Sequence, residues 1–225
     1  MQKNKQKRYK MLTKEELFKL GIESEDDLHV SISSGNFKMG KINSVSLPPL
    51  VYCISCGCCK QCYARRLQRY KQVKNAWLRN SVILDTDREK YFREVEGAIM
   101  LSRFFRFHVS GDIVDDDYFF HMCEIASRYP SCEILAFTKK FDIVNKYIGN
   151  FGELPKNLHI IFSAWKGLQM SNPFLLPEAH VLYNDGITTA NDGAKYCGGN
   201  CTVCAKEHCG CWSLQKGEQV IFKQH

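Results

Sequence analysis

The sequence predicts an α/β protein in which a parallel sheet with helical crossovers forms part of a β/α barrel. Two observations predict this fold class. From residue 47 onward, short apolar segments alternate with longer segments of helical periodicity, and strands joined through helices run parallel. Polar side chains and two cysteine-rich segments also follow the ends of the apolar segments, which is where parallel α/β folds bind their ligands.

The chain divides into a lead-in, residues 1–46, and one cysteine-rich β/α domain, residues 47–225. The 225 residues with 44% hydrophobic content are enough for one substantial core. A short helix is expected over 13–21, where Thr13 and Glu16 form a capping box. The first ten residues form a basic arm, whose cations are Lys3, Lys5, Lys7, Arg8 and Lys10.

The expected elements of the domain follow from apolar runs and helical periodicity. Three acidic residues open the segment 115–129 and suit the positive end of a helix dipole. Strands are expected within 48–55, 104–112, 132–140, 157–165 and 180–185, and helices within 59–79, 87–102, 115–129 and 141–149. The strand within 180–185 is expected to be the last, with the second cysteine-rich segment after it.

Composition indicates a cytoplasmic protein with no membrane association. The sequence contains no run of eighteen apolar residues, and the basic arm lacks the apolar stretch of a secretory signal. The net charge of +7 indicates either a solvated surface or an anionic partner. Nucleic acid could bind through the basic arm or through the cations and tyrosines of the helix within 59–79, which are Tyr63, Arg65, Arg66, Arg69, Tyr70, Lys71 and Lys74.

Ten of the twelve cysteines lie in two short segments. The first cysteine segment holds Cys53, Cys56, Cys58, Cys59 and Cys62, and the second holds Cys197, Cys201, Cys204, Cys209 and Cys211. Disulfides are rare in a reducing cytosol, and thiolates select zinc, copper(I) or iron–sulfur clusters. Four thiolates of one segment could close a tetrahedral zinc site, whereas crowded, unequal spacings between glycines favour an iron–sulfur cluster. Cys123 and Cys132, outside both segments, are expected to be buried packing residues.

Polar and aromatic residues follow three successive strands and are expected to line a pocket beside the metal. They are His108, Ser110, Asp112, Lys139 and Trp165. His108 is a candidate ligand or acid–base group, with a satisfied core histidine as the alternative. Asp112 could bind a cation or a cofactor amine, or it could cap the helix that begins near Asp115. Lys139 is a candidate partner for an anion, and Trp165 could shield a cluster from water or fill the barrel mouth.

The spacing C-x3-C-x2-C of Cys197, Cys201 and Cys204 resembles that of radical S-adenosylmethionine enzymes. In those enzymes three thiolates hold a [4Fe-4S] cluster with one iron open for S-adenosylmethionine. "CKQCYA" resembles their cluster loop, although it lacks this spacing, and Ser110-Gly111-Asp112 resembles their Gly-Gly-Glu turn. The resemblance implies a partial β/α barrel. With the strand-end positions, it makes His108, Asp112 and Lys139 the candidate catalytic residues, and Ser110, Gly111 and Trp165 the candidate cofactor-binding residues.

A closer resemblance, from about Lys41 onward, is to the phage gene product 88 family. It is carried by "KINSVSLPP", "CCKQCYA", "AWLRN", "FRFHVSGDI", "LAFTKKFD", "FSAWKG", and the terminal C-x3-C-x2-C with "CW" and "VIFKQH". It implies a protein of phage or mobile-element origin, in a bacterial host cell, that holds one or two [4Fe-4S] clusters. The implied ligands are Cys53, Cys59, Cys62, Cys197, Cys201, Cys204 and Cys211. With Cys211 as a fourth ligand, every iron of the cluster would be bound by a cysteine thiolate. Without it, one iron would keep a free coordination position.

Two functions of different classes follow. The first is an iron–sulfur protein, redox-active or similar to radical S-adenosylmethionine enzymes, whose strand-end pocket takes an unknown small molecule or redox partner. The second is a zinc-stapled module that binds nucleic acid. Whether the protein is an enzyme stays open. Because both cysteine segments follow strand ends, we expect them to meet in space.

Overall fold

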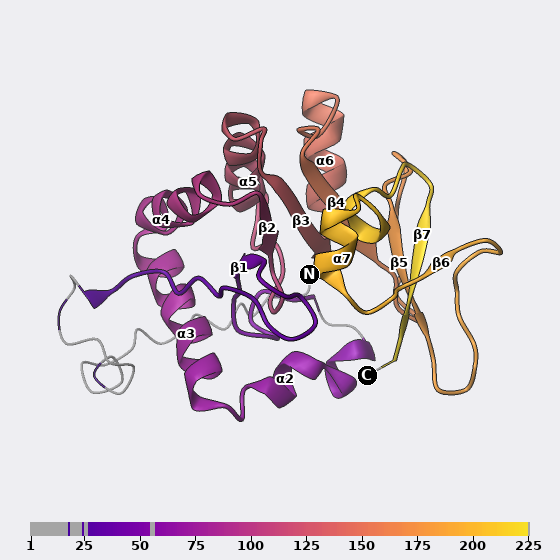
Figure 1. Cartoon of the computed structure of the whole chain (residues 1–225), viewed down its shortest axis with the longest axis horizontal. Coiled ribbons are helices and arrows are strands. Elements are labelled where there is room, and N and C mark those ends of the chain that lie inside the picture. The colour runs from indigo at the N-terminus through magenta and orange to yellow at the C-terminus, as the bar shows by residue number, and fades with distance from the viewer. Residues whose placement is uncertain (1–17, 19–23, 25–26, 55–56, 225) are drawn as a thin grey trace, which may run out of the picture.

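The structure is a computed structural model that describes residues 18, 24, 27–54 and 57–224. Within these residues seven strands form one open sheet in the order β1-β2-β3-β4-β5-β7-β6, and every neighbouring pair is parallel (Figure 1). The strands are β1 Asn43–Val45, β2 Phe104–Phe107, β3 Glu133–Thr138, β4 Leu158–Ser163, β5 Glu178–Leu182, β6 Lys195–Tyr196 and β7 Gln219–Lys223. The expected α/β class with a parallel sheet is confirmed, and the sheet does not close on itself.

Helices connect β1 to β2, β2 to β3, β3 to β4 and β6 to β7, as the alternation predicted, whereas the fully described connections from β4 to β5 and from β5 to β6 contain no helix. The helices are η2 Gly57–Gln61, α2 Tyr63–Leu67, α3 Lys71–Thr86, α4 Arg88–Met100, α5 Asp116–Arg128, α6 Phe141–Phe151, α7 Cys201–Lys206 and η3 Gly210–Trp212. Aspartates cap two of them: Asp87 accepts the Lys90 N–H in α4, and Asp115 accepts the Tyr118 N–H in α5. Across the described part of the chain, no helix has the length and apolarity needed to cross a bilayer.

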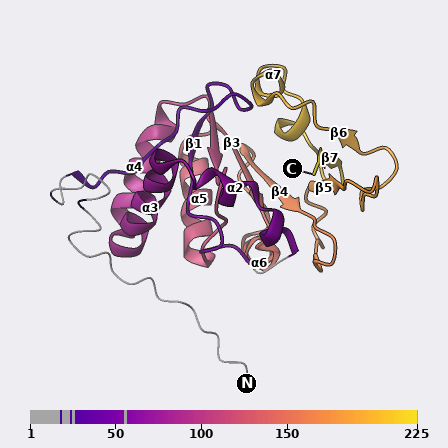
Figure 2. The same cartoon turned by 90° about the horizontal axis from the view of Figure 1, so that it is seen from below.

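The two faces of the sheet have different cores because side chains alternate along each strand. Phe105, Phe107 and Ile134 belong to a large apolar cluster packed between the sheet and α3, α4, α5 and α6. Residues of opposite parity, such as Leu135 and Ile161, belong to a second cluster that includes Ala205 of α7 and Trp212 of η3. Figure 2 accordingly shows α7 across the sheet from α5 and α6. The second cysteine segment is therefore placed on the face that the long helices leave open.

The strand expected within 48–55 is wrong, and the edge strand β1 lies earlier, in the lead-in. Pro48 and Pro49 cannot donate to a ladder, and Leu50 has φ 69. The helix expected within 59–79 is also divided, because Cys62 and Tyr70 have extended backbones where α2 and α3 begin. The helix expected over 13–21 lies outside the described residues apart from Phe18, which is helical.

The strand within 180–185 is not the last one. β6 and β7 follow it, and β7 inserts between β5 and β6. The second cysteine segment therefore lies on the crossover between two paired strands rather than on a C-terminal tail. Its first cysteine is tied to the sheet directly, since the Cys197 N–H donates to the Ile221 carbonyl at 2.9 Å.

Candidate functional site

Four cysteines of the second segment converge on one apolar cluster. Asn200 caps α7 by accepting the Val203 N–H at 3.2 Å, and the Cys201 N–H donates to the Lys38 carbonyl at 3.1 Å. These contacts hold the first turn of α7 between β6 and the loop before β1. The cysteines packed against the second apolar cluster are Cys197, Cys201, Cys204 and Cys211. This is the ligand set that the family resemblance implied for this segment.

The thiols of this set act on one another electrostatically. Burial raises the pKa of Cys204 to about 11, with further increases from Cys209, Cys201 and Cys197. Burial likewise raises the pKa of Cys211 to about 12, and Cys197 adds to that rise. The two thiols are therefore protonated near neutral pH in the absence of metal. Binding of a metal to them must release protons, so its affinity would increase with pH.

Glycines allow the backbone to fold tightly around these thiols. The Gly199 N–H donates to the Cys197 Sγ at 3.4 Å. Gly210 has φ 57, and a Cβ at this position would lie 2.9 Å from the Cys204 Sγ. The Cys209 N–H donates to the Cys204 carbonyl at 2.9 Å. Cys209 was absent from the expected ligand set, yet its thiol is a hydrogen-bonding partner of Cys204.

The first cysteine segment covers the carboxyl ends of the central strands. Burial raises the pKa of Cys53 to about 11; Asp112 and Cys62 add to the rise, and Lys139 opposes it. Cys53 and Cys62 therefore lie near each other and near the residues that follow β2 and β3. Two further members of the segment lie in η2: Cys59 directs its thiol toward the Ile54 carbonyl at 4.0 Å, and Cys58 is disulfide-bonded.

Among the described residues, no group of three or more His, Cys, Asp or Glu side chains is arranged to hold a metal ion as it stands. The donor types nevertheless fit a soft metal or an iron–sulfur cluster, since Cys197, Cys201, Cys204 and Cys211 present sulfur from one short segment. Ligation would require their side chains to turn toward a common centre.

His108 is buried with no partner for its ring. It has φ 58 and is 4% exposed, and neither ring nitrogen has a hydrogen-bonding partner among the described residues. Its ring lies 5.8 Å from Phe107 and 5.5 Å from Tyr118. Burial, and secondarily the charge of Arg106, lower its pKa to about 3. The imidazole is therefore neutral near pH 7 and is not a satisfied core histidine.

Ser110 and Gly111 form the turn that crosses the end of β1. The Ser110 carbonyl accepts the Leu47 N–H at 3.0 Å, while the buried Ser110 hydroxyl has no partner among the described residues. Gly111 has φ 88, and a Cβ there would lie 2.8 Å from the Leu47 Cβ. The close approach of Leu47 explains the glycine without a cofactor.

Asp112 joins two strand ends and does not cap α5, whose cap is Asp115. Its Oδ1 accepts the Thr138 hydroxyl at 2.6 Å and the Ile113 N–H at 2.8 Å. Its Oδ2 accepts the Lys139 N–H at 3.0 Å. Burial raises the pKa of this carboxyl, and these hydrogen bonds oppose the rise. Asp112 thus has a structural role that the sequence did not reveal.

Trp165 packs over the first cysteine segment. A Cβ on Gly57 would lie 3.0 Å from the Trp165 Nε1, and the Trp165 ring meets Tyr183 edge-on with centroids 5.5 Å apart. Lys139, at the end of β3, acts electrostatically on Cys53 and Asp112. The structure thus brings Asp112, Lys139 and Trp165 to the first segment, while the His108 ring faces Tyr118 of α5.

Arg106 is a site residue that the sequence analysis missed. It lies on the face opposite the long helices, with its guanidinium 4.9 Å from the Phe137 ring centroid, and its buried Nε has no partner among the described residues. Burial raises the pKa of the Tyr63 phenol and of the Cys211 thiol, and the charge of Arg106 opposes both increases. Arg106 therefore lies within electrostatic reach of both cysteine segments.

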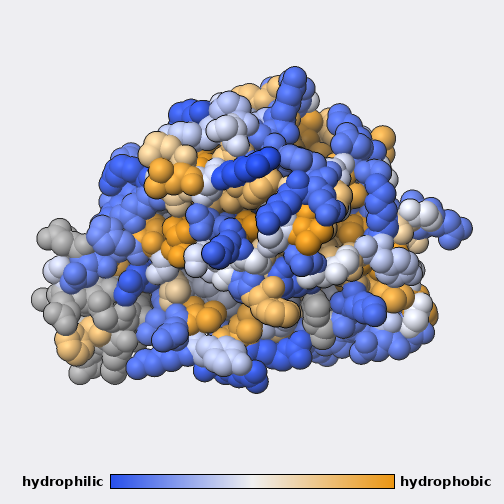
Figure 3. All heavy atoms as spheres, viewed as in Figure 1, coloured by the Kyte–Doolittle hydropathy of each residue, from blue (hydrophilic) through white to orange (hydrophobic). Residues whose placement is uncertain are grey.

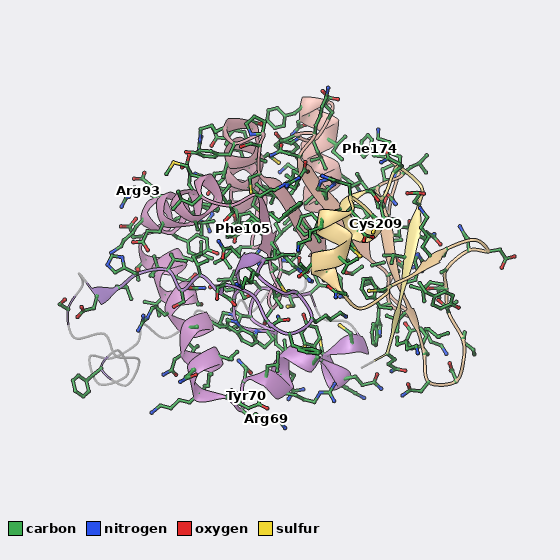
Figure 4. All side chains as sticks on the ribbon, in the orientation of Figure 1. Arg69, Tyr70, Arg93, Phe105, Phe174 and Cys209 are labelled. Atoms are coloured by element: carbon green, nitrogen blue, oxygen red, sulfur yellow. The ribbon has the colours of Figure 1, made fainter. Side chains whose placement is uncertain are left out.

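The sequence feature that could have identified Arg106 is the alternation of apolar and polar residues along β2. Phe105 and Phe107 face the long helices, so Arg106 between them must face the cysteines. Figure 4 shows Phe105 on β2 and Cys209 beside α7. Tyr63, which begins α2, donates its hydroxyl hydrogen to the Val109 carbonyl and so ties the first cysteine segment to the loop after β2.

Comparison with known proteins identifies the family of the chain. The sequence model of the gene product 88 family, described as "Gene product 88", matches residues 6–179. No curated protein and no solved structure matches the chain. The matched range begins before Lys41 and ends before Cys197, so it includes the first cysteine segment and, contrary to our expectation, not the second. Because the match covers well over half of the sequence, the chain belongs to the gene product 88 family.

Proposed function

We propose that this protein binds an iron–sulfur cluster through the second cysteine segment. The observation that carries the proposal is that four of its thiols pack against one apolar cluster beside the sheet. The proposed ligands are Cys197, Cys201, Cys204 and Cys211. The first segment, through Cys53, Cys59 and Cys62, is proposed as the ligand set of a second cluster.

The surroundings of the thiols favour a cluster over a single zinc ion. The Gly199 N–H donates to the Cys197 sulfur, and hydrogen bonds to sulfur tune iron–sulfur clusters. Trp212 is 4% exposed and meets Phe104 edge-on at 5.2 Å, so this part of the site is shielded from water. The C-x4-C-x-C end of the segment, from Cys204 to Cys211, also lacks the paired C-x2-C spacing of common zinc sites.

A bound cluster would supply electron transfer or, if one iron lacked a thiolate, a coordination position for S-adenosylmethionine. The chain's own residues have separate roles in this proposal. Arg106 would offset the negative charge of the thiolates, and the apolar cluster would limit access of water. An open parallel sheet with cysteines on the face away from the helices is compatible with a partial barrel like that of radical S-adenosylmethionine enzymes.

The strand-end residues are proposed to form a small-molecule or redox-partner site beside the first cysteine segment. Support comes from Lys139, whose charge acts on Cys53, and from the buried Ser110 hydroxyl, which has no partner among the described residues. The His108 ring also lacks a partner among them, but it faces Tyr118 of α5. Asp112 contributes by holding the loop that carries Ser110. An anionic group is the ligand chemistry that the Lys139 ammonium and the Ser110 hydroxyl would favour.

Anaerobic reconstitution with iron and sulfide tests the proposal. We expect the wild-type protein to become brown, with bound iron and acid-labile sulfide in equal amounts. Cys204→Ala should lose the share of this loading that the second cysteine segment holds. The matched control is Cys123→Ala, because Cys123 is a buried thiol in α5 with its pKa raised by burial to about 12, and it should keep its loading. A colourless protein that retains zinc and takes up no iron would overturn the proposal in favour of a zinc-stapled module.

A further inference from the structure

The surface of η2, α2 and the start of α3 has an unusual charge distribution. The sequence contains no aspartate or glutamate from Leu28 to Leu84. Six exposed cations of this stretch form what we call the basic surface: Lys60, Arg65, Arg66, Arg69, Lys71 and Lys74. They belong to one continuous segment that begins beside Cys62.

The cations of the basic surface have no carboxylate partners within the described residues. Elsewhere, cations pair with acids, as in Arg88 with Asp115 and Arg128 with Glu96. By contrast, Arg65 donates to the Cys59 carbonyl at 3.2 Å and Arg69 donates to the Tyr70 hydroxyl at 2.9 Å. These neutral acceptors position the guanidinium groups without cancelling their charge. The positive charge is therefore available to an anionic partner.

The basic surface is hollowed as well as charged. One hollow of about 500 Å³ is lined by Lys60, Gln61, Cys62, Arg65 and Arg66. A second of about 280 Å³ shares Arg66 with it and is lined also by Tyr63, Leu67 and Arg69. Hydrophilic residues predominate along the lower edge of the molecule in Figure 3, the edge occupied by α2 in Figure 1.

Aromatic rings are interleaved with the charges. Tyr70 is 50% exposed, and the Arg69 guanidinium carbon lies 4.9 Å from its ring centroid. Figure 4 shows both side chains together at the turn between α2 and α3. Proteins that bind single-stranded nucleic acid combine a positively charged groove, which follows the phosphates, with exposed rings on which bases stack.

We propose that the basic surface binds single-stranded nucleic acid. Lys60, Arg65 and Arg66 contact phosphates in the larger hollow, and Arg69 and Tyr70 provide a stacking position at its end. A duplex is disfavoured because α2 has only five residues, too few to present a reading helix along a major groove. An acidic protein segment would satisfy the charges but would give the exposed Tyr70 ring no stacking partner. The proposal goes beyond cluster binding and does not depend on it.

Fluorescence anisotropy with the full chain tests this proposal. The probes are labelled oligonucleotides of about 12 nucleotides, as single-stranded DNA and RNA, with a duplex and polyglutamate as competitors. The charge variant is Arg65→Gln with Arg66→Gln. Its matched control is Lys156→Gln with Lys216→Gln, two exposed cations that precede β4 and β7 at the other end of the sheet.

We expect the wild-type protein to bind a single strand and the charge variant to bind at least about tenfold more weakly. For the charge variant, the slope of log association constant against log salt concentration should be smaller in magnitude by about 1.4. Each of the two lost phosphate contacts accounts for about 0.7 of this slope. Tyr70→Leu should weaken binding about tenfold through lost stacking, with the salt slope unchanged. The control variant should match the wild type, and thermal melting establishes that every variant is folded.

Three outcomes would overturn the proposal. They are absence of binding by the wild type at low salt, equal losses in the charge variant and its control, and polyglutamate or duplex competing as well as the single strand. A Cys204→Ala protein that lacks the second-segment cluster and still binds the oligonucleotide would support it, and would separate this surface from the cluster site proposed in that segment.

Discussion

The Asp112 carboxylate accepts a hydrogen bond from the Thr138 hydroxyl at 2.6 Å, with both side chains buried. The same carboxylate accepts the Lys139 N–H at 3.0 Å. Asp112 thereby joins the loop after β2 to the end of β3, and its charge is felt by Cys53 in the first cysteine segment. The carboxylate therefore holds together the strand ends on which the candidate pocket depends.

We expect Asp112→Ala to lower the free energy of unfolding by about 2–4 kcal/mol, because buried donors would lose a charged acceptor. Thr138→Val should cost about 1 kcal/mol, since it removes one donor and keeps the shape. Urea unfolding followed by circular dichroism measures both. Asp116→Ala is the control; Asp116 pairs with Lys146 at the surface, where loss of an ion pair costs about 1 kcal/mol or less. An Asp112→Ala protein as stable as the control would contradict this role.

His108 should make stability depend on pH. Its folded-state pKa of about 3 lies below the ordinary value of 6.5, so the unfolded chain binds an extra proton between these values. Stability should therefore fall as pH decreases from 6.5 toward 3, by up to about 1.4 kcal/mol per pH unit from this residue. His108→Phe should flatten the curve of unfolding free energy against pH in this interval.

The control for His108 is His29→Phe, since the His29 side chain is 67% exposed. Unfolding free energies are measured by urea titration at several pH values, and the slopes of the variants are compared with that of the wild type. His29→Phe should leave most of the slope in place. If His108→Phe retained the full slope, other groups would have to account for the acid sensitivity.

The elements with strong periodicity were predictable from sequence, and those defined by tertiary contacts were not. α4 and α5 were expected because their apolar spacing and aspartate caps are local signals. β1 was missed because it has only three residues and obtains its hydrogen bonds from β2. β7 was missed because its insertion between β5 and β6 is a property of the whole sheet.

The residues of the candidate site likewise differ in whether the sequence alone could predict their roles. Spacing singled out Cys197, Cys201 and Cys204, and the family resemblance added Cys211; the structure packs all four against one apolar cluster. Spacing alone did not reveal that Cys209 turns back onto Cys204, because that contact depends on Gly210 at φ 57. The hydrogen bonds by which Asp112 joins two strand ends were also not predictable from sequence, because its partner Thr138 is 26 residues away.

Gly210 provides a test of the second segment that leaves every cysteine in place. Gly210→Ala would put a Cβ 2.9 Å from the Cys204 Sγ at a φ of 57. Gly217→Ala meets a similar backbone penalty at φ 78 with no atom within 4 Å, so it is the matched control. We expect Gly210→Ala to reduce iron loading in reconstitution well below that of Gly217→Ala. Equal loading in the two variants would mean that backbone strain, and not contact with Cys204, is the only effect.

Arg106 should tune the electronic properties of a bound cluster. Because its positive charge lies within reach of Cys211, Arg106→Met should make the reduction potential more negative by removing a nearby cation. Arg103→Met is the control, since the Arg103 guanidinium lies over Phe104 at 5.4 Å and its side chain is exposed. Potentials are measured by anaerobic redox titration. A shift to more positive values in Arg106→Met, or equal shifts in both variants, would contradict the proposed role.

The last prediction separates an electron-transfer protein from an enzyme that uses S-adenosylmethionine. Cys211 packs with Cys197, Cys201 and Cys204 against the same apolar cluster, so we expect four thiolates to close the cluster in the second segment. On anaerobic reduction with S-adenosylmethionine, the loaded wild-type protein should then form no more 5′-deoxyadenosine than Cys204→Ala, which lacks the second-segment cluster. Cys211→Ala, which removes the fourth thiolate, should keep its iron and change the electron paramagnetic resonance spectrum when S-adenosylmethionine is added. If the wild type forms 5′-deoxyadenosine and Cys204→Ala does not, one iron is open in the native protein. In that case the protein is a catalyst, and Cys211 serves packing rather than ligation.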